Sequence, residues 1–356
     1  MNNRPKALVL LAPAFPANES ETNWVPSQQV FVAAMKDRYP DIRLFILTFY
    51  YPDRKGPYRW NGVEVIPFNG EGYRKGRRPL FWNRIWKELN RIRREYDLLG
   101  LFSFWCAECA AVGHYFGLRH GIGHYCWICG QDARATNKWV RWIRPGEDEL
   151  IGMSDFLVEE FARNHGIRPS RMIPNAIDPS LFPAVLPKEK DIHLLGAGSL
   201  SRLKRYPLFV EAVDRLRRSV PDIKAVLCGD GEERQLLMGL AEKYDLDKQL
   251  VFTGELQHVE VLRLMQRAKV FLHTSEYEGY ASACLEALYA GAHVISFCKP
   301  LNENIPHWHV VGSTEEMIAT ALCLLQETDL NGEPVLPHTM KESAEAVMAL
   351  FYTGRM

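Results

Sequence analysis

Short apolar runs alternate along the chain with longer stretches whose apolar residues recur at helical spacing. The run at 6–12, KALVLLA, suits a buried strand, whereas 28–38 carries an apolar stripe on one face of a helix. Such alternation is typical of parallel sheets covered by helices, an α/β fold. It predicts strands at 6–12, 43–49, 97–104, 124–129, 150–155, 193–197, 224–230, 249–254, 270–272 and 294–296, and helices at 28–38, 108–118, 155–164, 236–244, 262–268, 283–290 and 341–351.

The stretch 269–296 predicts a strand, a polar turn, a helix and a second strand. We expect Ser282 to cap the helix at 283–290 and Gly291 to end it. In a parallel sheet the turn and the helix N-terminus lie at the edge where ligands bind. Backbone N–H groups and the helix dipole favour an anion such as phosphate there. The residues predicted to bind it are Gly279, Tyr280, Ala281 and Ser282.

Two glutamates bracket this turn. Glu278 precedes it, and Glu286 lies within the helix. A carboxylate is a poor neighbour for phosphate, but it accepts two hydrogen bonds from a vicinal diol such as ribose or a sugar ring. The turn and the glutamates together therefore predict a nucleotide-sugar site. The alternative is an ordinary strand–helix unit with solvated glutamates.

The segment EGYASACLE, from Glu278 to Glu286, resembles the paired-glutamate motif of retaining GT-B glycosyltransferases of the family-4 type (group 1). The resemblance implies two Rossmann-like parallel-sheet domains facing each other across a cleft. It places Glu278 near the transferred sugar as a catalytic residue and Glu286 on the ribose hydroxyls. It also implies retention of anomeric configuration, with neither a divalent metal nor a cofactor beyond the nucleotide-sugar donor.

The loop after the strand at 193–197 extends the resemblance. The family has Gly-Arg-Leu and then a lysine there, two cations that clamp the donor diphosphate. Gly198 and Lys204 match, but Ser199 stands in place of the arginine. We predict Lys204 as a catalytic cation and Gly198, Ser199 and Arg202 as donor-binding residues. Whether Arg202 replaces the missing charge stays open, because bidentate geometry is demanding.

The first half of the chain resembles the family more loosely. The loop at 14–27 lacks the glycines that the family has there. Asp132 occupies the place of a short loop that, in the family, faces the cleft, so similarity makes it a candidate contact to acceptor or donor sugar. The alternative is that Asp132 caps the following helix.

A proline-spaced, charged stretch near 187 is typical of a linker. We therefore predict a domain boundary between 186 and 187, and the resemblance implies that 1–186 is the acceptor-binding domain and 187–339 the donor-binding domain. In the GT-B arrangement the helix at 340–356 would return to the first domain.

Charge and hydrophobicity argue against a nucleic-acid-binding protein and against a membrane span at the start of the chain. With 43 basic and 43 acidic residues, the chain is not a dedicated nucleic-acid binder, and the apolar run at 8–11 is too short to span a membrane. We expect a cytoplasmic protein.

Two short cysteine motifs, CAEC and CWIC, match a zinc ribbon by spacing. Cysteines three apart in a strand point to opposite faces, so buried free thiols are favoured over zinc. The four cysteines are Cys106, Cys109, Cys126 and Cys129.

The stretch 73–96 is densely basic and carries apolar residues at helical spacing. One interpretation is a helix that buries its apolar stripe while its arginines face water. The other adds docking of the basic face on anionic lipid, at the inner face of the membrane, where the acceptor is lipid-linked.

These observations predict a transferase that moves a hexose-type sugar from a nucleoside diphosphate sugar to a glycan, a lipid-linked saccharide or another hydroxyl acceptor. A catalytically inactive nucleotide-sugar-binding protein of the same fold is the alternative. A dinucleotide-dependent oxidoreductase is disfavoured, because no third glycine completes the motif after Gly196 and Gly198. The donor sugar and base, the acceptor, the linkage and the oligomeric state do not follow from the sequence.

Overall fold

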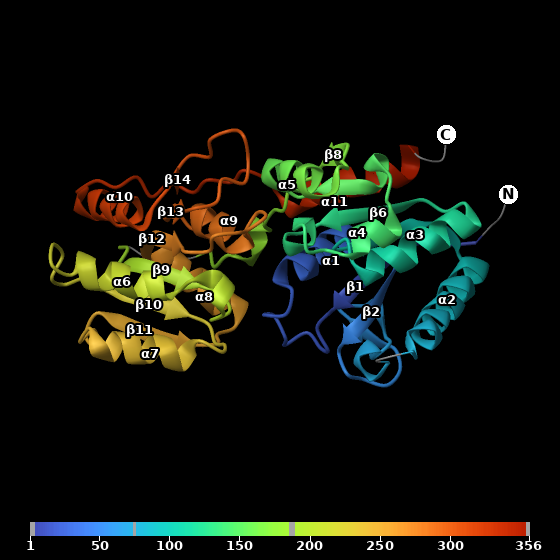
Figure 1. Ribbon diagram of the computed structural model, residues 1–356, viewed down its shortest axis with the longest axis horizontal. Coiled ribbons are helices and arrows are strands. Elements are labelled where there is room, and N and C mark those ends of the chain that lie inside the picture. The colour runs from blue at the N-terminus through green and yellow to red at the C-terminus, as the bar shows by residue number, and fades with distance from the viewer. Residues whose placement is uncertain (1–3, 74–75, 185–188, 354–356) are drawn as a thin grey trace. The chain divides into compact units, whose positions relative to one another are not determined.

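The computed structural model of the protein describes residues 4–73, 76–184 and 189–353. The chain divides into two compact units, Met1–Asn175 with Met340–Met356, and Ala176–Thr339. Each unit is a largely parallel sheet covered by helices (Figure 1). The predicted α/β class with two parallel-sheet domains is therefore confirmed.

The first unit contains an eight-stranded sheet in the order β3-β4-β2-β1-β5-β6-β7-β8. β3 and β4 pair antiparallel, and the other neighbours pair parallel. Helix α11 packs against α1 in this unit. The strands are β1 (Lys6–Ala14), β2 (Arg43–Tyr51), β3 (Tyr58–Trp60), β4 (Val63–Pro67), β5 (Asp97–Phe104), β6 (His124–Ile128), β7 (Leu150–Gly152) and β8 (Arg171–Met172), and the helices are α1 (Pro26–Arg38), α2 (Arg78–Glu95), α3 (Glu108–His120), α4 (Trp139–Ile143), α5 (Asp155–His165) and α11 (Met340–Thr353).

The second unit contains a six-stranded parallel sheet in the order β11-β10-β9-β12-β13-β14. Its strands are β9 (Ile192–Ala197), β10 (Ala225–Cys228), β11 (Leu250–Gly254), β12 (Ala268–His273), β13 (His293–Ser296) and β14 (Trp308–Val310), and its helices are α6 (Pro207–Leu216), α7 (Arg234–Lys243), α8 (His258–Arg267), α9 (Ser282–Tyr289) and α10 (Thr314–Gln326).

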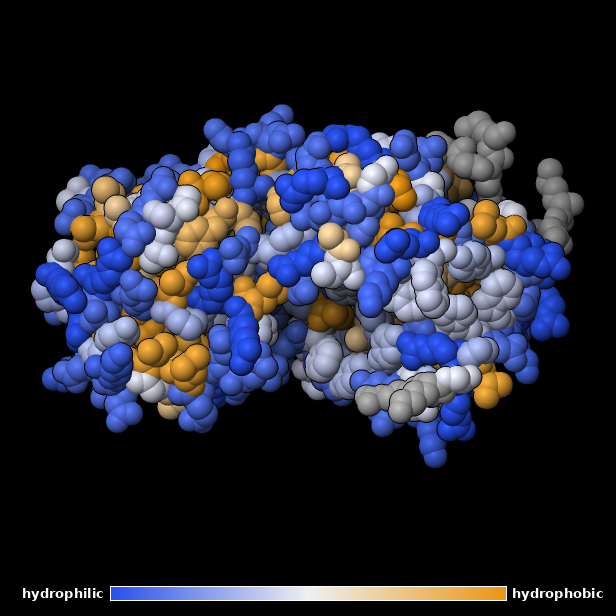
Figure 2. All heavy atoms as spheres, in the orientation of Figure 1, coloured by the Kyte–Doolittle hydropathy of each residue, from blue (hydrophilic) through white to orange (hydrophobic). Residues whose placement is uncertain are grey.

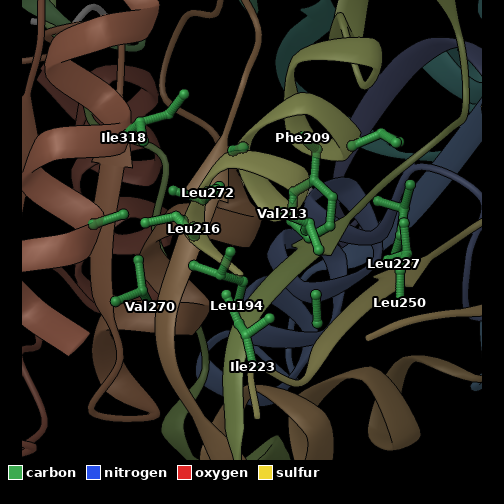
Figure 3. Close-up of a cluster of buried hydrophobic side chains, with 14 of the residues drawn as sticks. Leu194, Phe209, Val213, Leu216, Ile223, Leu227, Leu250, Val270, Leu272 and Ile318 are labelled. Atoms are coloured by element: carbon green, nitrogen blue, oxygen red, sulfur yellow. The ribbon is translucent and has the colours of Figure 1, made fainter. Parts of the chain in front are cut away.

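Apolar side chains between sheet and helices hold the second unit together. Figure 3 shows Phe209 and Val213 of α6 beside Leu194 of β9 and Leu227 of β10, and all four are buried. Hydrophilic residues cover most of the visible face of each unit, with hydrophobic residues scattered among them (Figure 2). The buried core fixes the strands, and hence the sheet edge from which the loops of the candidate site emerge.

The division between the units differs from the predicted linker. The expected boundary between 186 and 187 falls within 185–188, outside the described residues, whereas the units divide after Asn175. The intervening segment packs on the second unit. The ring of Phe182 lies 4.7 Å from that of Tyr289, and the Pro183 carbonyl accepts a hydrogen bond of 3.0 Å from Gln266.

The predicted cap of the helix at 283–290 is wrong, whereas the predicted glycine at its end is confirmed. Ser282 is the first residue of α9 rather than its cap; Ala281 holds the N-cap position, and no side chain makes a cap hydrogen bond there. Gly291 does follow the helix, with a φ of +79°. The elements that were not predicted are β3, β4, β8, β14, α4, α6 and α10.

Gly229 follows β10 in a conformation that admits no other residue. Its φ is +127°, and a Cβ there would lie 1.9 Å from the Gly198 carbonyl oxygen. We expect Gly229→Ala to lower the free energy of unfolding by at least about 2 kcal/mol. Urea denaturation checks this. Gly239→Ala on the exposed side of α7 is the control: no atom lies within 4 Å of its Cβ position, and helix propensity predicts a gain of about 0.5–1 kcal/mol. Equal effects of the two substitutions would contradict the prediction.

Candidate functional site at the carboxyl edge of the second sheet

The candidate site lies where two neighbouring strands of the second unit end. β9 and β12 pair in parallel, so the loops that follow them emerge at the same edge of the sheet. The first loop, after Ala197, carries the predicted cations. The second loop, after His273, carries the predicted glutamates. Residues far apart in the sequence therefore meet at one place.

Gly198 permits the first loop to turn away from β9. Its φ is +148°, and a Cβ there would lie 3.0 Å from the Tyr206 hydroxyl. Ser199 follows, with its hydroxyl oxygen 3.5 Å from that of Ser201. The loop then forms a short 3-10 turn, Arg202–Lys204 (η5), which ends on the predicted lysine.

An ion pair joins the two loops. Nζ of Lys204 lies 3.0 Å from Oε2 of Glu278, and the two side chains are 20% and 25% exposed. Thr274 donates a hydrogen bond of 2.5 Å to the Lys204 carbonyl, which fixes the η5 turn against the end of β12. The structure thus brings the predicted cation and the first glutamate into direct contact, within reach of solvent.

Glu286 lies on α9 and is 8% exposed. Nε2 of His258, the first residue of α8, lies 2.8 Å from Oε1 of Glu286. Burial alone would lower the pKa of His258, but the hydrogen bond and the negative charge of Glu286 outweigh it and raise that pKa. A buried carboxylate aligned in this way can accept hydrogen bonds from a diol. The sequence analysis missed His258, because no spacing rule connects it to Glu286.

The turn between the two glutamates leads directly into α9. Tyr280 and Ala281 are buried, and the Tyr280 ring centroid lies 6.0 Å from that of Trp308. Gly279 precedes them, and the helix begins at Ser282. The N-terminus of a helix is a favourable place for an anion, because its first N–H groups lack partners within the helix and its dipole is positive there.

Two arginines are candidates for the charge that Ser199 lacks. Arg202 is exposed on the η5 turn. Arg205 follows the turn; its guanidinium lies 3.6 Å from Glu276 in the second loop and 5.5 Å from the ring centroid of Phe297. Arg205 thus contacts the loop that carries Glu278, a position that the sequence analysis did not consider.

His273 is the last residue of β12, close to the Lys204–Glu278 ion pair, and is 5% exposed. Its Nε2 lies 3.9 Å from Oε2 of Glu278. Burial and the nearby positive charge of Lys204 lower the pKa of His273 to about 4, against the opposing effect of Glu278. The imidazole is therefore neutral at physiological pH.

This pKa predicts a specific loss of stability in acid. The unfolded chain protonates His273 near pH 6.5, whereas the folded protein does so only near pH 4. Relative to its value above pH 6.5, the free energy of unfolding therefore falls by about 3 kcal/mol as the pH drops toward 4, because the buried ring resists the protonation that the unfolded chain undergoes. Urea denaturation of wild type and His273→Leu between pH 7.5 and 4 measures the difference. An identical pH dependence in the two proteins would contradict the assignment.

Asp132 belongs to the first unit, in the short 3-10 turn Gln131–Ala133, and is 7% exposed. Its carboxylate accepts hydrogen bonds of 2.8 Å from the backbone N–H of Cys106 and of 2.8 Å from that of Gly130. Burial raises the pKa of this carboxyl, although these donors oppose the rise. The contacts join the end of β6 to the turn before α3, so Asp132 anchors its loop. A contact to sugar stays a prediction.

The paired cysteines lie in the same region of the first unit. Cys106, Cys109 and Cys126 are buried, and Cys129 is partly buried; all four are free thiols. Within the described residues, no three histidine, cysteine or acidic side chains are placed to hold a metal ion. Burial raises the pKa of the Cys126 thiol well above its usual value. A thiol in such surroundings is unreactive.

The part of the chain that carries the candidate site is similar to a known protein family. Residues 179–306 match the family described as Glycosyl transferases group 1. Glycogen synthase from Mycobacterium tuberculosis is 30% identical over 179 residues, which are 49% of this chain and 43% of that protein. The gpi3 subunit of phosphatidylinositol N-acetylglucosaminyltransferase from Schizosaccharomyces pombe is 26% identical over 269 residues, 71% of this chain and 58% of the relative. The chain thus spans about half the length of these relatives.

Solved structures resemble the whole chain. HepE from Anabaena, crystallised with UDP and glucose, has a TM-score of 0.67 at 15% identity, covering 98% of this chain and 96% of that one. Sucrose-phosphate synthase from Thermosynechococcus elongatus has a TM-score of 0.66 at 16% identity, covering 98% and 97%. At such low identity the likeness establishes the fold. Residues 179–306, which carry Lys204, Glu278 and Glu286, are thus similar to the glycosyl transferases group 1 family, and the chain has the GT-B fold.

Proposed function

We propose that this chain is a retaining glycosyltransferase that moves a hexose-type sugar from a nucleoside diphosphate sugar to a hydroxyl acceptor. The observation that carries the proposal is the arrangement at the edge of the second sheet. There a lysine–glutamate pair and a second, buried glutamate flank the N-terminus of α9. The similarity of residues 179–306, the range that contains these side chains, to group 1 glycosyltransferases supports it.

Each part of this edge has a role in the proposed reaction. A nucleoside diphosphate is a good leaving group, so the main requirement is to stabilise the charge that develops on the diphosphate. Lys204, the loop at 198–202 and the N-terminus of α9 would do this. Glu286, aligned by His258, would hold the ribose hydroxyls. Glu278 would contact the donor sugar, and the acceptor hydroxyl would attack from the side of the leaving group.

The proposed reaction uses no divalent metal. The chain contains an Asp-x-Asp triplet, Asp245-Leu246-Asp247, a pattern of carboxylates that suits a metal. The triplet lies between α7 and the start of β11, at the amino edge of the parallel sheet. Lys204 and Glu278 lie at the opposite, carboxyl edge, so this triplet is not part of the candidate site.

Two similar proteins limit the choice of the donor's nucleotide base and of the acceptor. HepE was crystallised with UDP-glucose, and the gpi3 relative is a subunit of a phosphatidylinositol N-acetylglucosaminyltransferase. We propose a uridine or guanosine donor and a saccharide or lipid-linked acceptor. Asp132 and its loop in the first unit are proposed to contact the acceptor side.

A screen of nucleotide sugars tests the proposal. Donors that bind the native state raise the melting temperature. Release of nucleoside diphosphate from the donors that bind, with and without saccharide acceptors, then measures turnover. Binding without any turnover would favour the inactive binding protein, for which Ser199 in place of arginine is the supporting observation. The absence of binding by every donor would contradict both.

We also propose that α2 contacts anionic membranes. Its apolar stripe is buried, as the first interpretation of this stretch predicted, and Phe81, Ile85, Leu89 and Ile92 form it. The opposite face keeps exposed basic side chains, and Leu80 at its start is 58% exposed. Among the described residues, no helix combines the length and hydrophobicity that a bilayer-spanning segment requires. Arg74 and Lys75 of the basic stretch lie outside those residues.

Vesicle sedimentation tests this contact. We expect binding to phosphatidylserine vesicles but not to phosphatidylcholine vesicles, because each basic residue near an anionic surface contributes about 1 kcal/mol. Loss of three basic charges alone corresponds to about 100-fold, so reversing three exposed charges of α2 should weaken binding by at least that factor. The variant is Arg84→Glu, Lys87→Glu and Arg94→Glu, and the control in the second unit is Lys243→Glu, Lys248→Glu and Arg263→Glu. Equal losses in both variants, or no binding by wild type, would exclude this surface.

A further inference from the structure

His273 is a buried side chain without hydrogen bonds. Neither Nδ1 nor Nε2 has a hydrogen-bond partner among the described residues, and both atoms are shielded from solvent. The hydroxyl of the nearby Ser275 is buried without a partner as well. Buried polar groups are almost always satisfied in native proteins, so an exception needs an explanation. These exceptions gather at the end of β12, beside the candidate site.

A carboxylate close to this imidazole, that of Glu278, is already held by another residue. Oε2 of Glu278 lies 3.9 Å from Nε2 of His273, too far for a hydrogen bond, and 3.0 Å from Nζ of Lys204. The same oxygen therefore lies between a cation that binds it and an imidazole that does not. A shift of about 1 Å would bring it within hydrogen-bond distance of His273.

We propose that His273 is a positioning residue that takes hold of Glu278 when the donor diphosphate draws Lys204 away. This inference rests on the proposed function. In the free protein Lys204 fixes Glu278. A bound diphosphate competes for the lysine, because its oxygens carry more negative charge than one carboxylate. Nε2–H of His273 then donates to Oε2 and keeps the carboxylate directed at the donor sugar.

A neutral imidazole suits this task. Because the pKa of His273 lies at about 4, the ring adds no positive charge beside Lys204 and does not neutralise Glu278. It still offers one directional N–H donor, whose tautomer the hydrogen bond to Glu278 would select. The ring nitrogens lack partners in the free protein because, in this proposal, the hydrogen bond to Glu278 forms only when the donor is bound.

Two substitutions separate this role from a structural one. His273→Leu removes the donor but keeps an apolar side chain of similar size, and His273→Asn restores an N–H donor. At pH 7.5 we expect the leucine variant to be as stable as wild type or more stable, since a buried unsatisfied group is lost. We expect its affinity for UDP or GDP to stay within about twofold, and its turnover of UDP-glucose or GDP-mannose to fall at least about tenfold. The asparagine variant should recover part of that turnover.

The control is His193→Gln, at the start of β9 on the opposite edge of the same sheet. It should leave turnover unchanged. Wild-type turnover by the leucine variant would overturn the role of His273 while leaving the proposed function intact. A parallel loss of stability and turnover would also overturn it, because the role would then be structural. Failure of wild type to bind any nucleoside diphosphate would overturn the proposed function and this inference together.

Discussion

Replacing Lys204 with alanine is expected to lower the turnover of the nucleotide-sugar donor by about 100- to 1,000-fold. Removing one fixed donor from a site that stabilises developing negative charge has effects of this size in other enzymes. The η5 turn, fixed to the end of β12 through Thr274, holds the backbone of Lys204 in place, and donor binding moves its ammonium from Glu278 to the diphosphate before charge develops there. Steady-state kinetics of diphosphate release measures the change.

The matched control is Lys243→Ala, an exposed lysine at the end of α7, which should leave turnover unchanged. Arg202→Ala and Arg205→Ala then identify the second cation. The variant with the larger loss of diphosphate affinity, measured with the nucleoside monophosphate as reference, marks the arginine that compensates for Ser199. Lys204→Ala with wild-type turnover would remove the lysine from the mechanism.

Replacing Glu286 with alanine is expected to weaken nucleoside diphosphate binding by about 2–3 kcal/mol, or about 30- to 150-fold. The reason is the loss of charge-assisted hydrogen bonds from a diol to a buried carboxylate that His258 aligns. Calorimetric titration measures the affinity.

A double-mutant cycle makes this test specific. Wild type should prefer the ribonucleotide to its 2′-deoxy analogue, and Glu286→Ala should lose that preference, because the hydroxyl and the carboxylate are partners. Binding free energies that are not additive for the Glu286→Ala substitution and the removal of the 2′-hydroxyl would show that Glu286 contacts the ribose. If the variant kept the full preference for ribose, Glu286 would have another role, and His258 would be aligning it for a different ligand.

The second unit was predictable where the chain repeats strand, loop and helix. The strands at 193–197, 249–254 and 294–296 were expected within one or two residues, because continuous apolar runs between polar turns have few alternatives. Helix α6 was missed although its residues alternate at helical spacing. The short β3, β8 and β14 were missed because three or fewer residues of edge strand carry little periodicity.

The sequence allowed several residues of the candidate site to be named, but not the side chains that contact them. The sequence pointed to Lys204, Glu278 and Glu286, and the parallel sheet explains why the first two meet. It could not assign His258 or His273, because their significance comes from burial and from partners distant in the chain. Ser282 was wrongly predicted as a cap because a serine before an apolar run is only a general signal for the start of a helix. Helix boundaries are the least reliable part of a prediction from sequence.

A crystal structure of the protein with its nucleotide-sugar donor is the most direct test of the central claim. We predict the diphosphate between Lys204 and the first turn of α9, the ribose hydroxyls on Glu286, and the sugar beside Glu278. A donor bound elsewhere, with both glutamates free of ligand contacts, would contradict the assignment of this sheet edge as the donor site.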